Sequence, residues 1–199
     1  LTESWNNTAW TEAADLSTGR NSGASDGSSN LVNLAFGGYD GSNNVSSTEE
    51  WTFSGLPPST PAAGYSDAIV GQMYYNSATG QFKAIKEGGA PIGTWASGGA
   101  MNTARDNNAG AGTQTSAMSI NGTNPPPTNL GIVELYDGSS WTETTDTNTA
   151  RRYGSANGPS GNTNVIYMGG YSTTNTGDTE VWNGSGWTEV NNLNVGRNN

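Results

Sequence analysis

Four arginines stand at a fixed distance from a tryptophan, and together they could hold an anion. Each follows its tryptophan by ten residues, in the pairs Trp10 and Arg20, Trp95 and Arg105, Trp141 and Arg151, and Trp187 and Arg197. A guanidinium binds carboxylates with two parallel hydrogen bonds, and an aromatic face can stack on the apolar side of a sugar ring. A position that every copy needs is, however, more typical of packing. We therefore expect both residue types to be structural parts of a repeat.

Glutamates also recur along the chain and are candidate partners for these arginines. One set follows the tryptophans and comprises Glu12, Glu143 and Glu189, while the other precedes them and comprises Glu3, Glu49, Glu134 and Glu180. We expect the arginines to form ion pairs or carbonyl contacts between neighbouring repeats. The sequence leaves open which set they use.

The composition excludes several classes of function. Seven Lys and Arg stand against 17 Asp and Glu, so nucleic acid is not an expected partner, because phosphate binding needs a basic surface. The lack of Cys and His removes thiolate and imidazole metal sites and histidine-based catalysis. No apolar run approaches the ~20 residues of a membrane span, and the first ten residues lack the features of a signal peptide. We expect no metal, no cofactor and no membrane insertion.

The repeated unit consists of four short segments that are typical of β-strands. In its last copy a small, Gly-rich stretch (151–158) precedes an apolar one ending in Gly-Gly-Tyr (164–171), and two further stretches (179–185 and 186–190) flank the turn sequence NGSG. Trp95, Trp141 and Trp187 are spaced 46 residues apart. Four antiparallel strands in a repeat of this length predict one blade of a β-propeller.

The Gly-Gly pair after the second strand, followed by an aromatic residue and a Trp at close spacing, resembles the kelch repeat. This resemblance covers the chain outside the insertion described next, and it implies an all-β fold with three full four-stranded blades and a half blade. It implies little about function, because kelch-like propellers serve many roles. We expect the chain to be an excerpt of a larger ring, with edges supplied by another chain or copy as the alternative.

One repeat is interrupted, which divides the chain into three parts. Residues 1–53 form the half blade and the start of the next blade, residues 54–93 an insertion, and residues 94–199 the remaining blades. The insertion opens with a Pro-rich connector and continues as a predicted β-hairpin (71–89). Tyr75, Asn76, Thr79 and Phe82 give this hairpin a phrase that resembles one common in phage tail and fibre proteins.

Aromatic residues that break the repeat pattern are the better candidates for ligand binding, because insertions in repeat proteins often form the binding face. The candidates, together with a nearby lysine, are Tyr65, Tyr74, Tyr75, Phe82, Lys83 and Tyr153. Tyr74 and Phe82 have an alternative role as the core of the small hairpin.

Catalytic sites find little support in the sequence, and we predict no catalytic residue. The adjacent Glu49 and Glu50 would point to opposite faces of a strand, which makes them a poor carboxylate pair for glycoside hydrolysis. The segment YDGSSW (136–141) is similar to the Asp box of sialidases but lacks its Ser-x-Asp opening.

The sequence therefore favours a non-enzymatic structural or adhesion protein of a virion or another extracellular location. Its expected partners are other virion or fibre subunits and a host-surface glycan, within an oligomeric assembly. A purely structural repeat, forming a filament, coat or appendage without a soluble ligand, is the alternative from another class. A glycan-cleaving enzyme is the third hypothesis.

Overall fold

The computed structural model describes residues 1–5, 10–29, 32–53, 73–76, 81–84, 93–125, 127–158 and 162–198. Within these ranges the regular secondary structure is entirely β-strand, which confirms the all-β prediction, and no helix is present that could cross a membrane. Short strands and tight turns are what the Gly- and Thr-rich composition favours.

Twelve strands form three antiparallel four-stranded sheets, each following the order of the chain. The first sheet contains β3 (Ala24–Ser29), β4 (Val32–Phe36), β5 (Thr48–Phe53) and β8 (Gly93–Ser97). The second contains β9 (Ala109–Thr113), β10 (Ser116–Asn124), β11 (Thr128–Tyr136) and β12 (Trp141–Thr144). The third contains β13 (Ser155–Asn157), β14 (Val165–Met168), β15 (Thr179–Trp182) and β16 (Trp187–Val190).

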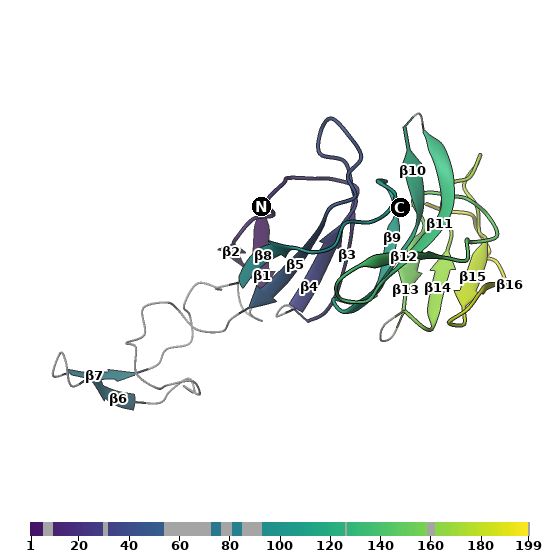
Figure 1. Cartoon of the computed structure of the whole chain (residues 1–199). Helices are drawn as coiled ribbons and strands as arrows, with labels where there is room; N and C mark the ends of the chain where they lie inside the picture. Colours follow the sequence, from purple (N-terminus) through teal and green to yellow (C-terminus); the bar gives the residue numbers. More distant parts are fainter. Residues whose placement is uncertain are drawn as a thin grey trace.

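Two further strand pairs accompany these sheets. At the N-terminus β1 (Thr2–Trp5) pairs with β2 (Trp10–Ala13), and the two correspond to the third and fourth strands of a repeat. The second pair, β6 (Met73–Asn76) and β7 (Gln81–Ala84), falls in sequence between β5 and β8 and lies apart from the three sheets (Figure 1). Strands β5 and β8 are nevertheless hydrogen-bonded neighbours, with Trp51 opposite Trp95.

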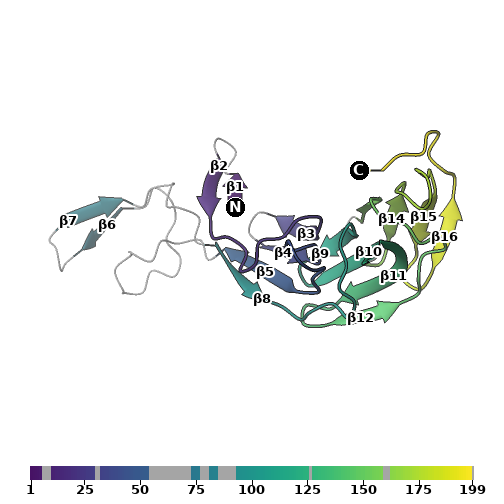
Figure 2. The ribbon, with the colours of Figure 1, turned by 90° about the horizontal axis from the view of Figure 1, so that it is seen from above.

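The three sheets follow one another along an arc (Figure 2). The first strands β3 and β9 lie toward the inner side of this arc, and the last strands β8, β12 and β16 lie along its outer side. Strand β9 contacts both β3 and β13, so neighbouring sheets meet at their first strands.

The hydrophobic core lies between the sheets. One cluster joins Leu34 and Phe36 of β4 to Tyr136 and Trp141 of the second sheet. The other joins the second and third sheets through Ala109, Ala111, Met118, Ile120, Val133, Val165, Tyr167, Trp182 and Trp187. Strand β10 takes part in both clusters, because its apolar side chains alternate between its two faces. A central sheet covered on both sides explains why this second strand is almost wholly buried.

A Gly-Gly pair, or Asn-Gly in the second sheet, fixes the turn at the end of each second strand. Gly37 and Gly38 have φ of 65° and 101°, a region that side chains rarely adopt. A Cβ on Gly38 would also lie 2.6 Å from the carbonyl oxygen of Asn21, so the loop packs directly against the linker before β3. The same contact recurs where Gly122 meets Asp106 and where Gly170 meets Arg152.

Candidate functional site

The repeat arginines form buried ion pairs. Arg105 contacts Glu134 at 2.6 Å and Arg151 contacts Glu180 at 2.6 Å, with all four side chains almost fully buried. Arg20 pairs in the same way with Glu49. Each arginine precedes the first strand of a sheet, and its glutamate lies on the third strand of that same sheet. The expectation that these contacts join neighbouring repeats is therefore wrong, because the linker folds onto the sheet that follows it.

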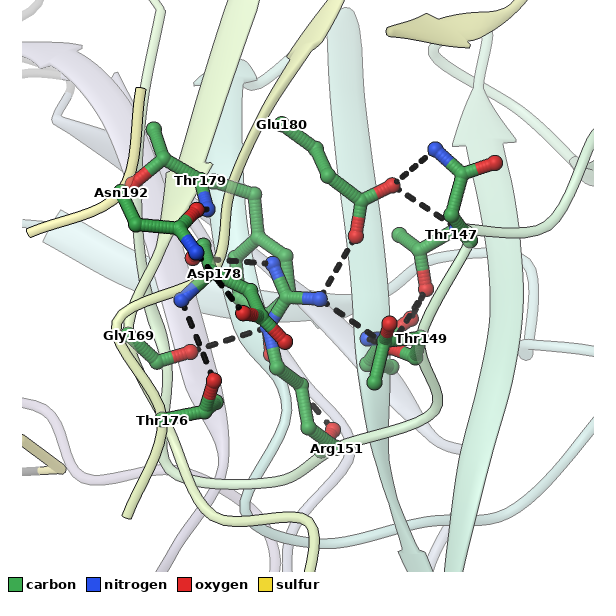
Figure 3. Close-up of polar contacts among 12 residues, drawn as sticks. Thr147, Thr149, Arg151, Gly169, Thr176, Asp178, Thr179, Glu180 and Asn192 are labelled. Atoms are coloured by element: carbon green, nitrogen blue, oxygen red, sulfur yellow. Dashed lines mark hydrogen bonds and ion pairs between the residues drawn. The ribbon is translucent and has the colours of Figure 1, made fainter. Parts of the chain in front are cut away.

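The glutamates also hold the linkers between sheets. The second carboxylate oxygen of Glu180 accepts the backbone N–H of Asn148 at 2.8 Å, and Glu134 and Glu49 accept those of Asn102 and Ser17. Figure 3 shows the Arg151 network, in which Nε donates to the carbonyl of Gly169 at 2.9 Å. Because its donors are used in this way, a buried repeat arginine stabilises the fold and does not bind a ligand. Arg197, the fourth copy, lies exposed beyond β16.

The repeat tryptophans differ in their burial. Trp141 packs 4.9 Å from the ring of Phe36 in the first sheet, and Trp187 is buried against the second sheet. Trp95 is only partly buried, and Trp10 is 64% exposed. Trp141 and Trp187 thus pack between sheets, which is the role expected for the repeat tryptophans.

Four other tryptophans border a hollow of about 310 Å³ beside β1 and β2, which is lined by Thr2, Glu3, Trp5, Trp10, Asn33, Trp51 and Trp95. Trp51 and Trp95 occupy the places that Tyr136 and Trp141 occupy in the second sheet, where β4 covers them. Since β1 and β2 correspond to third and fourth strands, they offer no second-strand residue to cover this pair. The hollow is therefore an incomplete copy of the contact between sheets, in which Trp51 is still buried and Trp95 is only partly buried.

The insertion contributes little to a described site. Tyr65 lies outside the described residues. In the β6–β7 hairpin the backbone register places Tyr75 opposite Phe82 and Tyr74 opposite Lys83. Tyr74 and Phe82 are offset by one position in this register, and their role as the core of the hairpin stays a prediction.

Tyr153, the last predicted ligand residue, belongs to an arc of linker residues with positive φ. Ser22, Asn107 and Tyr153 occupy the same position in successive repeats, with φ of 54°, 54° and 58°. The backbone N–H of Asn107 donates to the carbonyl of Ser22 at 2.7 Å, and that of Tyr153 donates to the carbonyl of Asn107 at 3.2 Å. These hydrogen bonds link the three repeats and explain why the left-handed conformation recurs.

A tyrosine is an unfavourable residue for this conformation. Asn and Gly adopt it readily, whereas a bulky side chain there is an outlier that costs on the order of 1–2 kcal/mol. Tyr153 is also 36% exposed, so burial of its ring offsets little of that cost. Strained residues of this kind cluster at functional sites.

Tyr153 borders a cavity of about 290 Å³ that lies between the linkers and the loops that follow the second strands. Its lining residues are Tyr39, Asn44, Asp106, Asn107, Thr123, Asn124, Pro125, Pro127, Arg152 and Tyr153. We call this cavity the Tyr153 pocket. It combines aromatic rings and prolines with amide, carboxylate and guanidinium groups, which is the mixture of apolar wall and few polar groups typical of small-molecule sites.

Arg152 projects among aromatic rings at this pocket. Its guanidinium carbon lies 4.9 Å from the ring centre of Tyr171 and 5.4 Å from that of Tyr153, both within the range of cation–π attraction. One of its terminal nitrogens donates to Oδ1 of Asn129 at 3.1 Å. Unlike the three repeat arginines, it has no carboxylate within 4.0 Å among the described residues.

Asp106 gives the pocket a carboxylate. Its Oδ1 accepts a hydrogen bond from the Asn44 amide at 3.3 Å, and Asn44 also donates to the carbonyl of Thr123 at 2.8 Å. Partial burial raises the pKa of Asp106 above its usual value, although the Asn44 hydrogen bond and the charge of Arg152 act in the opposite direction. The carboxyl group of Asp106 lines the pocket and can form hydrogen bonds with hydroxyl groups.

Most of this pocket was missed by sequence reasoning, which selected Tyr153 alone. A signal existed in the dipeptides that follow the four repeat arginines, which are Asn-Ser, Asp-Asn, Arg-Tyr and Asn-Asn. Three of them are small and polar, and Arg152 with Tyr153 forms the exception. Asn44 carries no such signal, because it is a loop residue brought to Asp106 from the neighbouring sheet.

The adjacent glutamates considered for catalysis are both engaged elsewhere. Glu49 is paired with Arg20, and Glu50 accepts a hydrogen bond of 2.5 Å from the Tyr136 hydroxyl of the second sheet. Within the described ranges no group of three or more acidic side chains is placed to hold a metal ion. Comparison of the sequence with protein-family models and with curated proteins finds no match, so inference about function starts from the Tyr153 pocket itself.

Proposed function

We propose that this chain is part of a β-propeller with kelch-like repeats that binds a saccharide without cleaving it. Support for the propeller comes from the repetition of one four-stranded unit along an arc, with first strands adjacent on its inner side. Each sheet hides its apolar side chains only against the next sheet, which is the packing principle of such repeats.

The observation that carries the binding function is the left-handed conformation of Tyr153. The repeat demands this conformation but is satisfied by Ser22 and Asn107 elsewhere. A tyrosine at this position weakens the fold and places an exposed ring at the rim of a cavity. A contribution to binding accounts for such a residue, whereas packing does not.

The chemistry of the pocket suits a saccharide. The Tyr153 ring offers a flat surface to the apolar face of a pyranose, and Asn44 and Asp106 offer amide and carboxylate groups to its hydroxyls. A cavity of about 290 Å³ accommodates a small part of a glycan, so a single site binds weakly. Several copies acting together would give the firm attachment that an adhesion protein needs.

The proposed setting is a virion or another extracellular surface, with subunits of the same assembly as further partners. Its support is the sequence of the β6–β7 hairpin, which resembles a phrase of phage tail and fibre proteins. The net charge of −10 is compatible with a protein that meets neither nucleic acid nor an anionic membrane.

A binding assay against a glycan panel and host cells tests this function. We expect the chain to bind at least one saccharide, and we expect the Tyr153→Asn variant, which carries the residue of the equivalent Asn107, to lose that binding. The Trp10→Ala variant is the matched control, because Trp10 is the more exposed aromatic residue but lies outside the pocket. Loss of binding with Trp10→Ala and not with Tyr153→Asn would move the site to the tryptophan hollow.

A second candidate is a filament or coat without a soluble ligand. The specific observation in its favour is the exposure of Trp5 and Trp10, since both belong to a face that is buried between sheets elsewhere. This function predicts concentration-dependent polymers that Trp10→Ala dissolves, as measured by light scattering and electron microscopy. Monomers that bind a glycan would rule it out.

A further inference from the structure

Arg152 lies at a position where the repeat uses the backbone of the residue and not its side chain. The equivalent residues are Asn21 and Asp106, and in each repeat this residue forms an isolated β-bridge to the residue after the Gly-Gly or Asn-Gly pair. Arg152 makes that bridge with Tyr171 as Asn21 makes it with Tyr39, through two backbone hydrogen bonds. The arginine side chain is thus not needed to place the loop.

The guanidinium is held in one place before any ligand arrives. The rings of Tyr153 and Tyr171 attract it, and the side-chain oxygen of Asn129 accepts one of its hydrogens. Asn129 is itself fixed, because its amide donates to the carbonyls of Tyr171 at 3.2 Å and Ser172 at 2.6 Å. A charged group fixed in this way loses little conformational freedom when it binds.

The electrostatic setting of Arg152 is unusual for this chain. Three of the repeat arginines form an ion pair with a glutamate, namely Arg20, Arg105 and Arg151. In a protein with 17 acidic and 7 basic residues, Arg152 still has no carboxylate within 4.0 Å in the described part of the chain. It therefore retains donors for an external anion at the edge of the cavity.

We infer that the Tyr153 pocket selects an acidic saccharide, whose carboxylate binds Arg152 while its pyranose ring lies on Tyr153. This inference rests on the proposed saccharide-binding function and adds the chemical class of the sugar, a uronic acid or another carboxylate-bearing pyranose. Arginine is the side chain best suited to hold a carboxylate with two parallel hydrogen bonds. Arg152 supplies the attraction, and a second charged residue that lines the same pocket supplies the orientation.

That orientation comes from Asp106. Its carboxylate lines the same cavity and would repel the acid group of a sugar bound the wrong way round. In the productive orientation Asp106 and Asn44 meet hydroxyls instead. An acidic sugar is thus bound in one direction, whereas a neutral sugar lacks both the attraction and the repulsion.

A pair of ligands in which a carboxylate is replaced by its uncharged methyl ester tests the inference on the unaltered chain. Oligogalacturonate and its methyl ester share a backbone, and isothermal titration or a glycan array compares them directly. We expect the acid to bind at least about tenfold more tightly than the ester, because charge-assisted hydrogen bonds exceed neutral ones by that much. We also expect the preference to shrink between 0.05 and about 0.5 M salt, since screening weakens an exposed ion pair.

Variants at Arg152 localise the effect. Arg152→Asn carries the residue of the equivalent Asn21, so we expect it to fold normally by circular dichroism and to lose the preference for the acid over the ester. Arg152→Lys should keep part of that preference, because it retains the charge without the two-pronged geometry. The control is Arg197→Asn, because Arg197 is an exposed arginine near Tyr153 that lies outside the pocket, and this variant should keep the preference in full.

The outcomes separate this inference from the function on which it rests. Equal binding of acid and ester, with binding still lost in Tyr153→Asn, would overturn the inference and leave the saccharide function intact. Binding of no saccharide at all would overturn both. Equal or tighter binding of an acidic peptide such as oligoglutamate at Arg152 would replace the sugar with a protein ligand, and loss through Arg197→Asn alone would move the anion away from the pocket.

Discussion

The indole N–H of Trp141 donates a hydrogen bond of 3.0 Å to Oγ1 of Thr48, and this bond joins the second sheet to the first. Both residues are buried, Thr48 with 1% of its surface exposed. In Thr48→Val the indole would lose its acceptor, and a buried unsatisfied donor costs about 1–3 kcal/mol. We expect the free energy of unfolding, measured with urea, to fall by about that amount.

The next repeat provides the reverse experiment. Val133 precedes Glu134 as Thr48 precedes Glu49, and it packs in the same cluster as Trp187, whose indole N–H has no described partner. In Val133→Thr a hydroxyl would stand where Thr48 stands, so we expect a change between neutral and about 1 kcal/mol stabilising. A strong loss of stability in this variant would mean that the two contacts between sheets are not equivalent.

The buried ion pair of Arg105 and Glu134 predicts a much larger effect. Glu134→Gln would leave the guanidinium without its counter-charge at a site where neither side chain is exposed, and breaking one partner of such a pair costs about 3–5 kcal/mol. Thermal unfolding should show a clear drop in Tm. The matched control is Asp137→Asn, which removes a carboxylate from an exposed turn. The equivalent residue of the third sheet is Asn183, and it accepts the same hydrogen bonds within its turn. We expect the Tm of this variant to change little.

These contacts show which parts of the fold were predictable from the sequence. The strands and their order follow from local signals, because turn sequences recur in each copy and a Gly-Gly or Asn-Gly pair follows each second strand. The partner set of the arginines did not follow, since choosing Glu134 over Glu143 requires knowing that the linker folds back onto the third strand of its own sheet. Periodicity reveals that two residues recur in each repeat. It does not reveal whether they meet within one repeat or between two repeats.

The candidate site illustrates the same limit. Tyr153 is visible in the sequence as a break in the pattern, but its left-handed conformation is set by a hydrogen bond to Asn107 in the previous repeat. Asn44 reaches Asp106 only because two sheets pack side by side. A site formed between repeats depends on how they pack, which a single repeat does not encode.

The raised pKa of Asp106 predicts a dependence of stability on pH. Burial favours the protonated form, so the folded state binds this proton more tightly than the unfolded state, whose pKa lies near 3.8. The contribution to stability is therefore greatest below that value and is lost as the pH rises through the folded pKa. We expect the Asp106→Asn variant, which carries the residue type of the equivalent Asn21, to be more stable than the original protein at pH 7.

That gain should disappear in acid, where Asp106 is protonated in both states. Urea unfolding of both proteins between pH 3 and 7 measures the difference directly. A gain that stays constant across this range would show that the substitution acts through packing or the Asn44 hydrogen bond rather than through ionisation.

Tyr153 predicts an opposition between stability and binding. In Tyr153→Asn the backbone hydrogen bond to Asn107 is kept, and the residue now tolerates φ of 58°. We expect the free energy of unfolding to rise by about 1 kcal/mol while saccharide binding is lost, since the ring that stacks on the sugar is gone. Tyr153→Phe serves as the comparison, because it keeps both the strain and the ring, and it should match the original protein in stability and retain most binding. A Tyr153→Asn variant that is less stable than the original would show that the ring is needed for packing, which would remove the reason for placing a ligand beside it.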